Sequence, residues 1–488
     1  MRLTTITRMS LPAGVVHRCA TDITTGQAEC TPLSFDQARH ASLGRRTGSW
    51  MALAFRLPFP ADRDHVARAW SVVIARHGTL RTVIEGGDGG GDGDTRDEGE
   101  RRDDDELRLR PVTVRQLGWQ TPQARPGEDP RAVLRRVFDE ACCPFATPAH
   151  ALCLVEPYAP ADPHDQPELP VVVIGLDHSH VDAWSLLVLM RDFCSCLDDL
   201  ACGLEPGTCL PPAAPFAEHT RELAARPPAP PEIHRRWAAI LERGGGEMPV
   251  FPLDLGDVST PRDEVVEVRD VLDPDGVAAL ETASAAEGVR MIAVALAEMT
   301  AVFQRRAGVG LRAVLPVHSR HHERWHDSVG WFITNSVVEC VDPDARACGA
   351  AVRDAVELGS HALGPILQPH GGMPHTPGMF AVSWLDYRRL PLEVNLSLNP
   401  QHVSAAIRTT GVMVWFVING SGLHVRCRYP DTARARESVG GWLDELCAGL
   451  AQRALNQVEP RDPDGQAEPR DPARGRPAAT PRPANARA

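Results

Sequence analysis

A histidine and an aspartate four residues apart follow a short apolar run and are the residues of this chain best suited to chemistry. The run at 171–174 is β-branched and has no polar face, which is typical of a strand covered on both sides. His178 and Asp182 come just after it, in the stretch LDHSHVDAWS, and a helix is predicted over 184–200. Imidazole titrates near neutral pH, so His178 at a strand end can take a proton from an attacking amine or hydroxyl.

The polar neighbours of this histidine are expected to play different parts. Residues two apart on a strand share a face, so His180 is the local rival for the role of base. Asp182 is expected to hold the loop through an arginine, because a carboxylate beside a guanidinium keeps a low pKa and is a poor base. The candidate partners are Arg320 first, then Arg76 and Arg81.

Three further residues carry two interpretations each. Asp177 either raises the basicity of His178 or fills a structural hydrogen-bonding position, and the second is favoured because adjacent strand residues point to opposite faces. Ser185 either caps the following helix or stabilises an oxyanion. Asn335 either orients a substrate or closes a strand.

The segment HERWH at 322–326 fits the zinc pattern HExxH, in which two histidines one helical turn apart bind the metal. Its context is different, because it follows a strand-like run and ends in DSVGWF without a helix signal. We therefore expect an exposed polar loop here and no metal site.

Four segments resemble, in the right order, the motifs of condensation domains of nonribosomal peptide synthetases and of the related polyketide-associated acyltransferases. Residues 177–183 are similar to HHxxxDG; they match at His178 and Asp182 and depart at Asp177 and Ala183. Three other segments extend the resemblance over about residues 32–450. TPLSFDQARH is similar to SxAQxRLW through Ser34, Gln37 and Arg39, and RHGTLRTVI at 76–84 is similar to RHExLRTxF and departs chiefly at Gly78. The third is the VGxFxN region, with Arg320, Gly330, Phe332 and Asn335.

The resemblance implies a fold and an activity. The implied fold is α+β, with two chloramphenicol acetyltransferase-like lobes of mixed sheets and flanking helices that meet as a V-shaped pseudo-dimer around a tunnel. The implied catalytic residue is His178, with Asp182 mostly structural. The implied protein is a free-standing acyltransferase that moves an acyl group from a phosphopantetheine thioester, on a carrier protein or coenzyme A, to an amine or hydroxyl acceptor in natural-product or lipid biosynthesis. No tightly bound cofactor is expected.

Two alternatives stay open at this point. Asp177 and Ala183 are compatible with a catalytically degenerate module that binds a carrier protein or recruits a tailoring enzyme. An epimerase-like relative that removes an α-proton is the third hypothesis. The chain has no lysine, and all 51 basic residues are therefore arginines, which excludes lysine nucleophiles and Schiff bases.

Hydrophobic periodicity indicates the elements that must position these residues. One helical face is formed by Val66, Ala69, Trp70, Val73 and Ile74, and a second by Ile292, Leu296, Met299, Val302 and Phe303. Strands are predicted at 311–317, 380–385, 402–410, 412–418 and 423–428, with the turn NGSG between the last two.

The predicted organisation has two lobes. An N-terminal lobe spans 1–205 with a disordered glycine- and aspartate-rich insert at 86–106, and a proline-rich linker spans 206–235. A C-terminal lobe spans 236–452, and a disordered tail rich in proline, arginine and alanine spans 453–488.

Composition bounds the partners. The net charge of −13 disfavours nucleic acid, which needs a basic face. No run approaches the length of a membrane helix, and the start of the chain lacks the apolar core of a signal peptide, so we expect a cytoplasmic protein. The 13 cysteines form no CxxC pair and are expected to be reduced and mostly buried.

Overall fold

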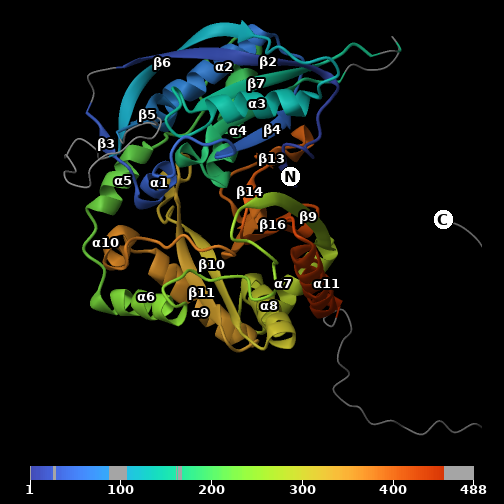
Figure 1. Cartoon of the computed structure of the whole chain (residues 1–488). Helices are drawn as coiled ribbons and strands as arrows, with labels where there is room; N and C mark the ends of the chain where they lie inside the picture. The colour runs from blue at the N-terminus through green and yellow to red at the C-terminus, as the bar shows by residue number, and fades with distance from the viewer. Residues whose placement is uncertain (1, 26–28, 87–106, 161, 163–167, 456–488) are drawn as a thin grey trace, which may run out of the picture.

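The computed structural model describes residues 2–25, 29–86, 107–160, 162 and 168–455. The predicted insert lies outside the described residues from residue 87 on, and the predicted tail lies outside them from residue 456 on. Within the described residues the architecture is α+β, with two mixed β-sheets and helices on both faces of each (Figure 1). This confirms the predicted fold class, while the V-shaped relation of the lobes stays a prediction.

The first sheet has nine strands and carries the stretch around His178. Eight of its strands follow one another in hydrogen-bonded order, and the ninth, β5 (Thr82–Glu85), pairs with β6. The order is β1 (Arg2–Thr5), β13 (Gln401–Ser404), β4 (Trp50–Arg56), β8 (Val171–Asp177), β7 (His150–Pro157), β2 (Gly14–Thr25), β6 (Arg108–Gln120) and β3 (Thr31–Pro32).

Alternating side chains of these strands enter two different cores, as the period of two along a strand requires. One face packs on α2 (Arg63–Arg76) and α4 (Ala183–Ala201), and the other packs on α3 (Pro130–Ala141). On β8, for example, Val172 and Ile174 belong to the first core and Val173 to the second. The apolar run therefore has no polar face because β8 is covered on both sides, as predicted.

The second sheet has seven strands and holds the other half of the described chain. In order they are β11 (Ile333–Cys340), β10 (Leu311–His318), β12 (Phe380–Asp386), β15 (Val412–Asn419), β16 (Gly422–Pro430), β9 (Arg262–Leu272) and β14 (Arg408–Thr409). The predicted turn NGSG is confirmed, since Asn419 pairs with Gly422 across the β15–β16 hairpin.

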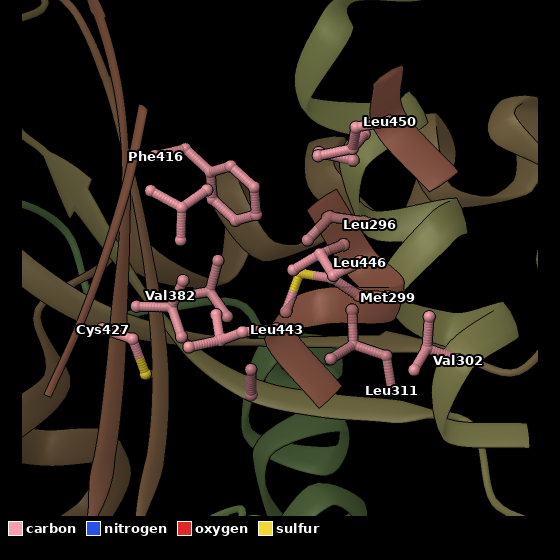
Figure 2. Close-up of a cluster of buried hydrophobic side chains, with 14 of the residues drawn as sticks. Leu296, Met299, Val302, Leu311, Val382, Phe416, Cys427, Leu443, Leu446 and Leu450 are labelled. Atoms are coloured by element: carbon pink, nitrogen blue, oxygen red, sulfur yellow. The ribbon is translucent and has the colours of Figure 1, made fainter. Parts of the chain in front are cut away.

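Helices cover both faces of the second sheet too. The larger core lies against α7 (Pro274–Ala286), α8 (Met291–Ala307) and α11 (Ala433–Leu455), and α9 (Ala345–Gly359) contributes to it. Figure 2 shows part of it, with Phe416 and Val382 of the sheet facing Leu296 and Met299 of α8 and Leu443 of α11. The opposite face packs on α6 (Pro231–Arg243) and α10 (Leu363–Leu367).

The two lobes are not consecutive in the sequence. The predicted single strand at 402–410 is wrong, because the chain places β13 in the first sheet, antiparallel to β4, and β14 in the second sheet, antiparallel to β9 (Figure 1). Ala405 is buried between these two strands and Ala406 and Ile407 are partly buried. This segment therefore ties the lobes together, and the predicted C-terminal lobe at 236–452 contributes a strand to the N-terminal sheet.

The predicted linker at 206–235 contains a helix of its own, α5 (Phe216–Ala224), before α6 begins. Phe216 is buried against Trp325 and Phe332. The two predicted amphipathic helices are confirmed as α2 and α8. All 13 cysteines are free and most are buried, as expected.

No helix among the described residues is long and apolar enough to cross a membrane. The remaining described helical turns are α1 (Phe35–Ala41) and the 3-10 segments η1 (Gly78–Arg81), η3 (His178–His180), η4 (Glu323–Trp325), η5 (Gln368–His370), η6 (Tyr387–Arg389) and η7 (Leu396–Leu398).

Candidate active site

The end of β8 is held in place on both sides. The backbone N–H of Asp177 donates to the carbonyl of Ala149, and that of His178 donates to the carbonyl of Ser49 at 3.0 Å. The chain then turns through η3, and α4 begins after Asp182, whose carboxylate accepts the N–H of Ser185 at 2.7 Å. The N-cap of a helix therefore lies four residues after His178 and limits the freedom of the loop between them.

His178 is half-buried and its ring lies on that of Trp331, with 4.2 Å between the ring centroids and 30° between the planes. Its Nδ1 is buried and has no hydrogen-bond partner among the described residues. Burial and the neighbouring His40 lower the pKa of His178, whereas its own backbone, Asp177 and Asp182 raise it. A pKa below the ordinary value leaves the imidazole neutral at pH 7, the form that accepts a proton.

His180 differs from His178 in access. The prediction that the two share a strand face is wrong, because the chain leaves β8 at Asp177 and both histidines lie in the 3-10 turn η3. His180 is only 3% exposed, its Nδ1 donates to the hydroxyl of Ser179 at 2.8 Å, and burial lowers its pKa. A side chain so enclosed cannot reach a substrate, and we retain His178 as the candidate base.

Asp177 fills the structural position that the sequence favours. Its carboxylate is fully buried and accepts hydrogen bonds from His40 Nε2 at 3.2 Å, from the hydroxyl of Ser49 at 2.7 Å, and from the N–H and hydroxyl of Ser179 at 3.0 and 2.5 Å. Burial raises the pKa of Asp177, but the bonds from His40 and Ser179 outweigh this effect and lower the pKa to about 2. Asp177 is therefore an ionised anchor.

Asp182 is bound to Arg320, which confirms the first of the three predicted partners. Nη2 of Arg320 lies 3.1 Å from Oδ1 of Asp182, and the second carboxylate oxygen accepts the N–H of Phe332 at 3.1 Å. Both charged side chains are buried. Arg76 binds Asp192 instead, at 2.7 Å, and Arg81 is on η1 with an Nε that has no described partner. The buried ion pair joins the two lobes directly beside His178.

Ser185 has neither of its predicted roles. The N-cap of α4 is Asp182, not Ser185, and the hydroxyl of Ser185 donates to the carbonyl of Gly330 and accepts from Gly330 N and Arg320 Nη2. Because this hydroxyl is fully buried and already bonded to Gly330 and Arg320, it links α4 to the other lobe and cannot bind an oxyanion. Asn335 is half-buried on β11, opposite Pro316 of β10.

The HERWH segment forms the short turn η4 and not a helix with two histidines on one face. Among the described residues, no group of three or more histidine, cysteine, aspartate or glutamate side chains is arranged to hold a metal ion. The carbonyl of His326 instead accepts the indole N–H of Trp184 at 3.0 Å. The zinc interpretation is therefore not supported in the described part of the chain.

Sequence reasoning missed two side chains that touch this site. His40, on α1, binds Asp177, and Trp331 covers His178. His40 could have been noticed because it is a polar residue at the position where the pattern SxAQxRLW has leucine. Trp331 stands at the variable position of VGxFxN, and nothing else in the sequence indicates its role. Gln37 of the same helix donates to the carbonyl of Ser179 at 2.7 Å, so α1 holds the loop at two points.

Comparison with known sequences finds one acyltransferase. PapA3 of Mycobacterium tuberculosis is 27% identical over 290 residues, which cover 56% of this chain and 61% of PapA3. The chain thus aligns with less than two thirds of that relative's length. No family model matches the sequence.

Comparison with solved structures finds the same fold over almost the whole chain. A PapA2 acyl transferase matches with a TM-score of 0.76 at 19% identity, over 93% of this chain and 100% of that one. The first condensation domain of the calcium-dependent antibiotic synthetase matches with a TM-score of 0.61 at 14% identity, over 89% and 98%. The X-domain from teicoplanin biosynthesis gives a TM-score of 0.63 at 16% identity, over 89% and 97%. The predicted resemblance to the condensation-domain superfamily is confirmed at the level of the fold.

Proposed function

We propose that this protein is an acyltransferase in which His178 removes the proton of the acceptor. The acceptor is an amine or a hydroxyl, and the donor is an acyl thioester of phosphopantetheine on a carrier protein or coenzyme A. The observation that carries the proposal is a half-buried, neutral imidazole at the end of β8, held next to the buried Asp182–Arg320 pair between the two lobes. The similarity to PapA3 supports the reaction class.

The two ring nitrogens of His178 have different surroundings. Nδ1 is buried and has no hydrogen-bond partner among the described residues. We assign the proton of the neutral ring to the buried Nδ1, which leaves the lone pair on Nε2. Nε2 is then the nitrogen that accepts the acceptor's proton.

The reaction needs no covalent enzyme intermediate. The nitrogen or oxygen of the acceptor attacks the thioester carbonyl with its lone pair, and its proton passes to Nε2 of His178. The C–S bond of the thioester then breaks. The leaving thiolate takes the proton back from His178, which regenerates the neutral ring. A positioned base of this kind contributes roughly 10² to 10⁴ in rate, and holding donor and acceptor together contributes much of the rest.

The proposal includes the partners. A carrier protein or coenzyme A brings the activated acyl group, and no tightly bound cofactor is required. The product is an amide or an ester in natural-product or lipid biosynthesis.

The test is acyl transfer followed by mass spectrometry, with a panel of acyl-pantetheine and acyl-coenzyme A donors and mixed amine and alcohol acceptors. His178→Ala is expected to lower the rate by about 10² to 10⁴. The matched control is His65→Ala, because His65 is an exposed histidine that also contacts an aspartate. A His178→Ala protein that keeps the full transfer rate refutes the assignment.

A second candidate is a non-catalytic module that binds a loaded carrier. Two observations favour it: Asp177 replaces the first histidine of the motif, and the Trp331 ring lies on His178. Binding of acyl-carrier without turnover across the panel, in the wild type and in Trp331→Ala alike, would support this candidate over the acyltransferase.

A further inference from the structure

The chain departs from two family patterns at positions that meet in space. HHxxxDG has histidine where this chain has Asp177, and SxAQxRLW has leucine where this chain has His40. The two residues are 137 positions apart, and Nε2 of His40 lies 3.2 Å from both carboxylate oxygens of Asp177. An acid in the place of a histidine thus meets a histidine in the place of an apolar residue.

The donor and acceptor roles of the two ring nitrogens of His40 follow from its other neighbour, Arg46. Nη2 of Arg46 lies 2.8 Å from His40 Nδ1 and 3.3 Å from Nε2, and Nη1 donates to the His40 carbonyl at 2.8 Å. A guanidinium can only donate and the Asp177 carboxylate can only accept, so the nitrogen nearer to Arg46, Nδ1, is assigned as the acceptor. Nε2 is therefore the ring nitrogen that donates its proton to Asp177.

The ring of His40 also contacts Trp331, the indole that lies on the ring of His178. Its edge packs on Trp331 with 5.3 Å between centroids and 73° between planes, and its centroid is 6.2 Å from that of His178. Trp331 in turn stacks on His178. His40 thus contacts, through its nitrogen, the residue before His178 and, through its ring, the indole that lies on His178.

We propose that His40 is a positioning residue, which together with Asp177 replaces the first histidine of the motif and sets the orientation of His178 through the loop and through Trp331. This rests on the proposed function, since orientation matters most to an acting base. Arg46 binds the other ring nitrogen of His40, Nδ1, and Gln37 of α1 adds a second contact to the turn after β8.

The proposal predicts that the two departures depend on each other. His40→Leu and Asp177→His are each expected to lower kcat/KM about tenfold to a hundredfold, because small displacements of a catalytic group are costly. The double variant, which restores both family residues, is expected to lose less than the product of the two single losses. Losses that simply multiply would overturn the proposal.

A conservative variant separates the contact with Asp177 from general damage. His40→Gln keeps an N–H donor toward Asp177 and is expected to retain more activity than His40→Leu. The control is His65→Leu, whose ring contacts Asp62 at 2.9 Å on the surface and whose loss is expected to leave the rate unchanged. Equal activity of His40→Leu and His65→Leu would contradict a positioning role.

The pH profile gives a readout that a purely structural defect would not shift. The titratable and charged groups facing His178 are His40, Asp177 and Asp182. Without His40, Asp177 has one donor fewer and its charge acts more strongly on His178, so the acidic limb of the kcat/KM profile moves to higher pH. An unmoved limb in His40→Leu would count against the proposal.

Two measurements judge the proposal even if no acyl transfer is found. Long-range ¹H–¹⁵N spectra of histidine-labelled protein, assigned with His40→Gln, are expected to show His40 protonated at Nε2; protonation at Nδ1 overturns the proposal. In thermal unfolding, the summed Tm losses of His40→Leu and Asp177→His are expected to exceed that of the double variant. An inactive wild type with these two results would reject the proposed function and keep the His40–Asp177 pairing.

Discussion

Replacing Arg320 by glutamine should destabilise the protein far more than removing a surface arginine. Arg320 donates to the carbonyls of Trp325 and Ser328 at 2.6 and 2.7 Å, and to Asp182 and Ser185 at 3.1 and 2.6 Å. The side chain is fully buried and that of Asp182 is 2% exposed. The substitution therefore leaves a buried carboxylate without its countercharge and removes the guanidinium donor from two carbonyls, of which that of Trp325 keeps the N–H of Ser328.

The magnitude follows from that geometry. Breaking a buried ion pair by removing one partner costs about 3–5 kcal/mol, since the remaining charge stays out of water. Asp182 keeps its hydrogen bonds from the N–H groups of Ser185 and Phe332, which partly stabilise the remaining charge. We therefore expect a loss of stability in the lower half of this range. An exposed pair such as Arg235–Glu232 contributes less than about 1 kcal/mol, so Arg235→Gln is the matched control.

The assay is equilibrium unfolding in urea. Far-UV circular dichroism and tryptophan fluorescence are followed together, because coincident transitions are the condition for a two-state fit. Asp182→Asn should cost a similar amount, and the double variant should cost less than the sum of the two. If Arg320→Gln is no more destabilising than Arg235→Gln, the ion pair does not hold the lobes and the reasoning fails.

The remaining predictions concern pH and packing. Burial lowers the pKa of His150 to about 4 and of His402 to about 3, so the unfolded chain binds these protons first as pH falls below about 6.5. The free energy of unfolding should therefore drop between pH 6.5 and 4, by about 3 kcal/mol from His150 alone, and His150→Gln should flatten urea midpoints measured across this range; midpoints of the wild type that do not change with pH would contradict this. Asp36 acts in the opposite direction, because burial raises its pKa to about 6. Gly330→Ala should cost about 1–3 kcal/mol in the same assay, since its new Cβ would lie 2.3 Å from a buried phenylalanine ring of α5, whereas Gly78→Ala meets no atom within 4 Å and serves as control; equal stability of the two variants would refute the packing argument.

Local patterns in the sequence were sufficient for the elements and for half of the site. The apolar run of β8 and the helical faces of α2 and α8 depend on periodicity, which is a local property. His178 and Asp182 lie four residues apart and just beyond that strand, so their proximity needs no tertiary information. The Arg320 partnership was predictable because a buried carboxylate requires a cation.

Only the tertiary structure decided how distant segments share the site. The strand predicted at 402–410 is divided between two sheets, because the lobes meet there: β13 pairs between β1 and β4 in the first sheet, and β14 forms the edge of the second. The role of Ser185 depends on Gly330, 145 residues away, and no spacing rule predicts that contact.

The pairing of His40 with Asp177 has the same physical basis. Each residue looks like an isolated departure from a pattern, and their hydrogen bond exists only because α1 packs on the turn after β8. The sequence alone determined which residues can exchange protons and which strand delivers them. Packing between segments more than a hundred residues apart decided that His178 is accessible, that Asp177 is a buried structural carboxylate, and that Trp331 lies on the ring of His178.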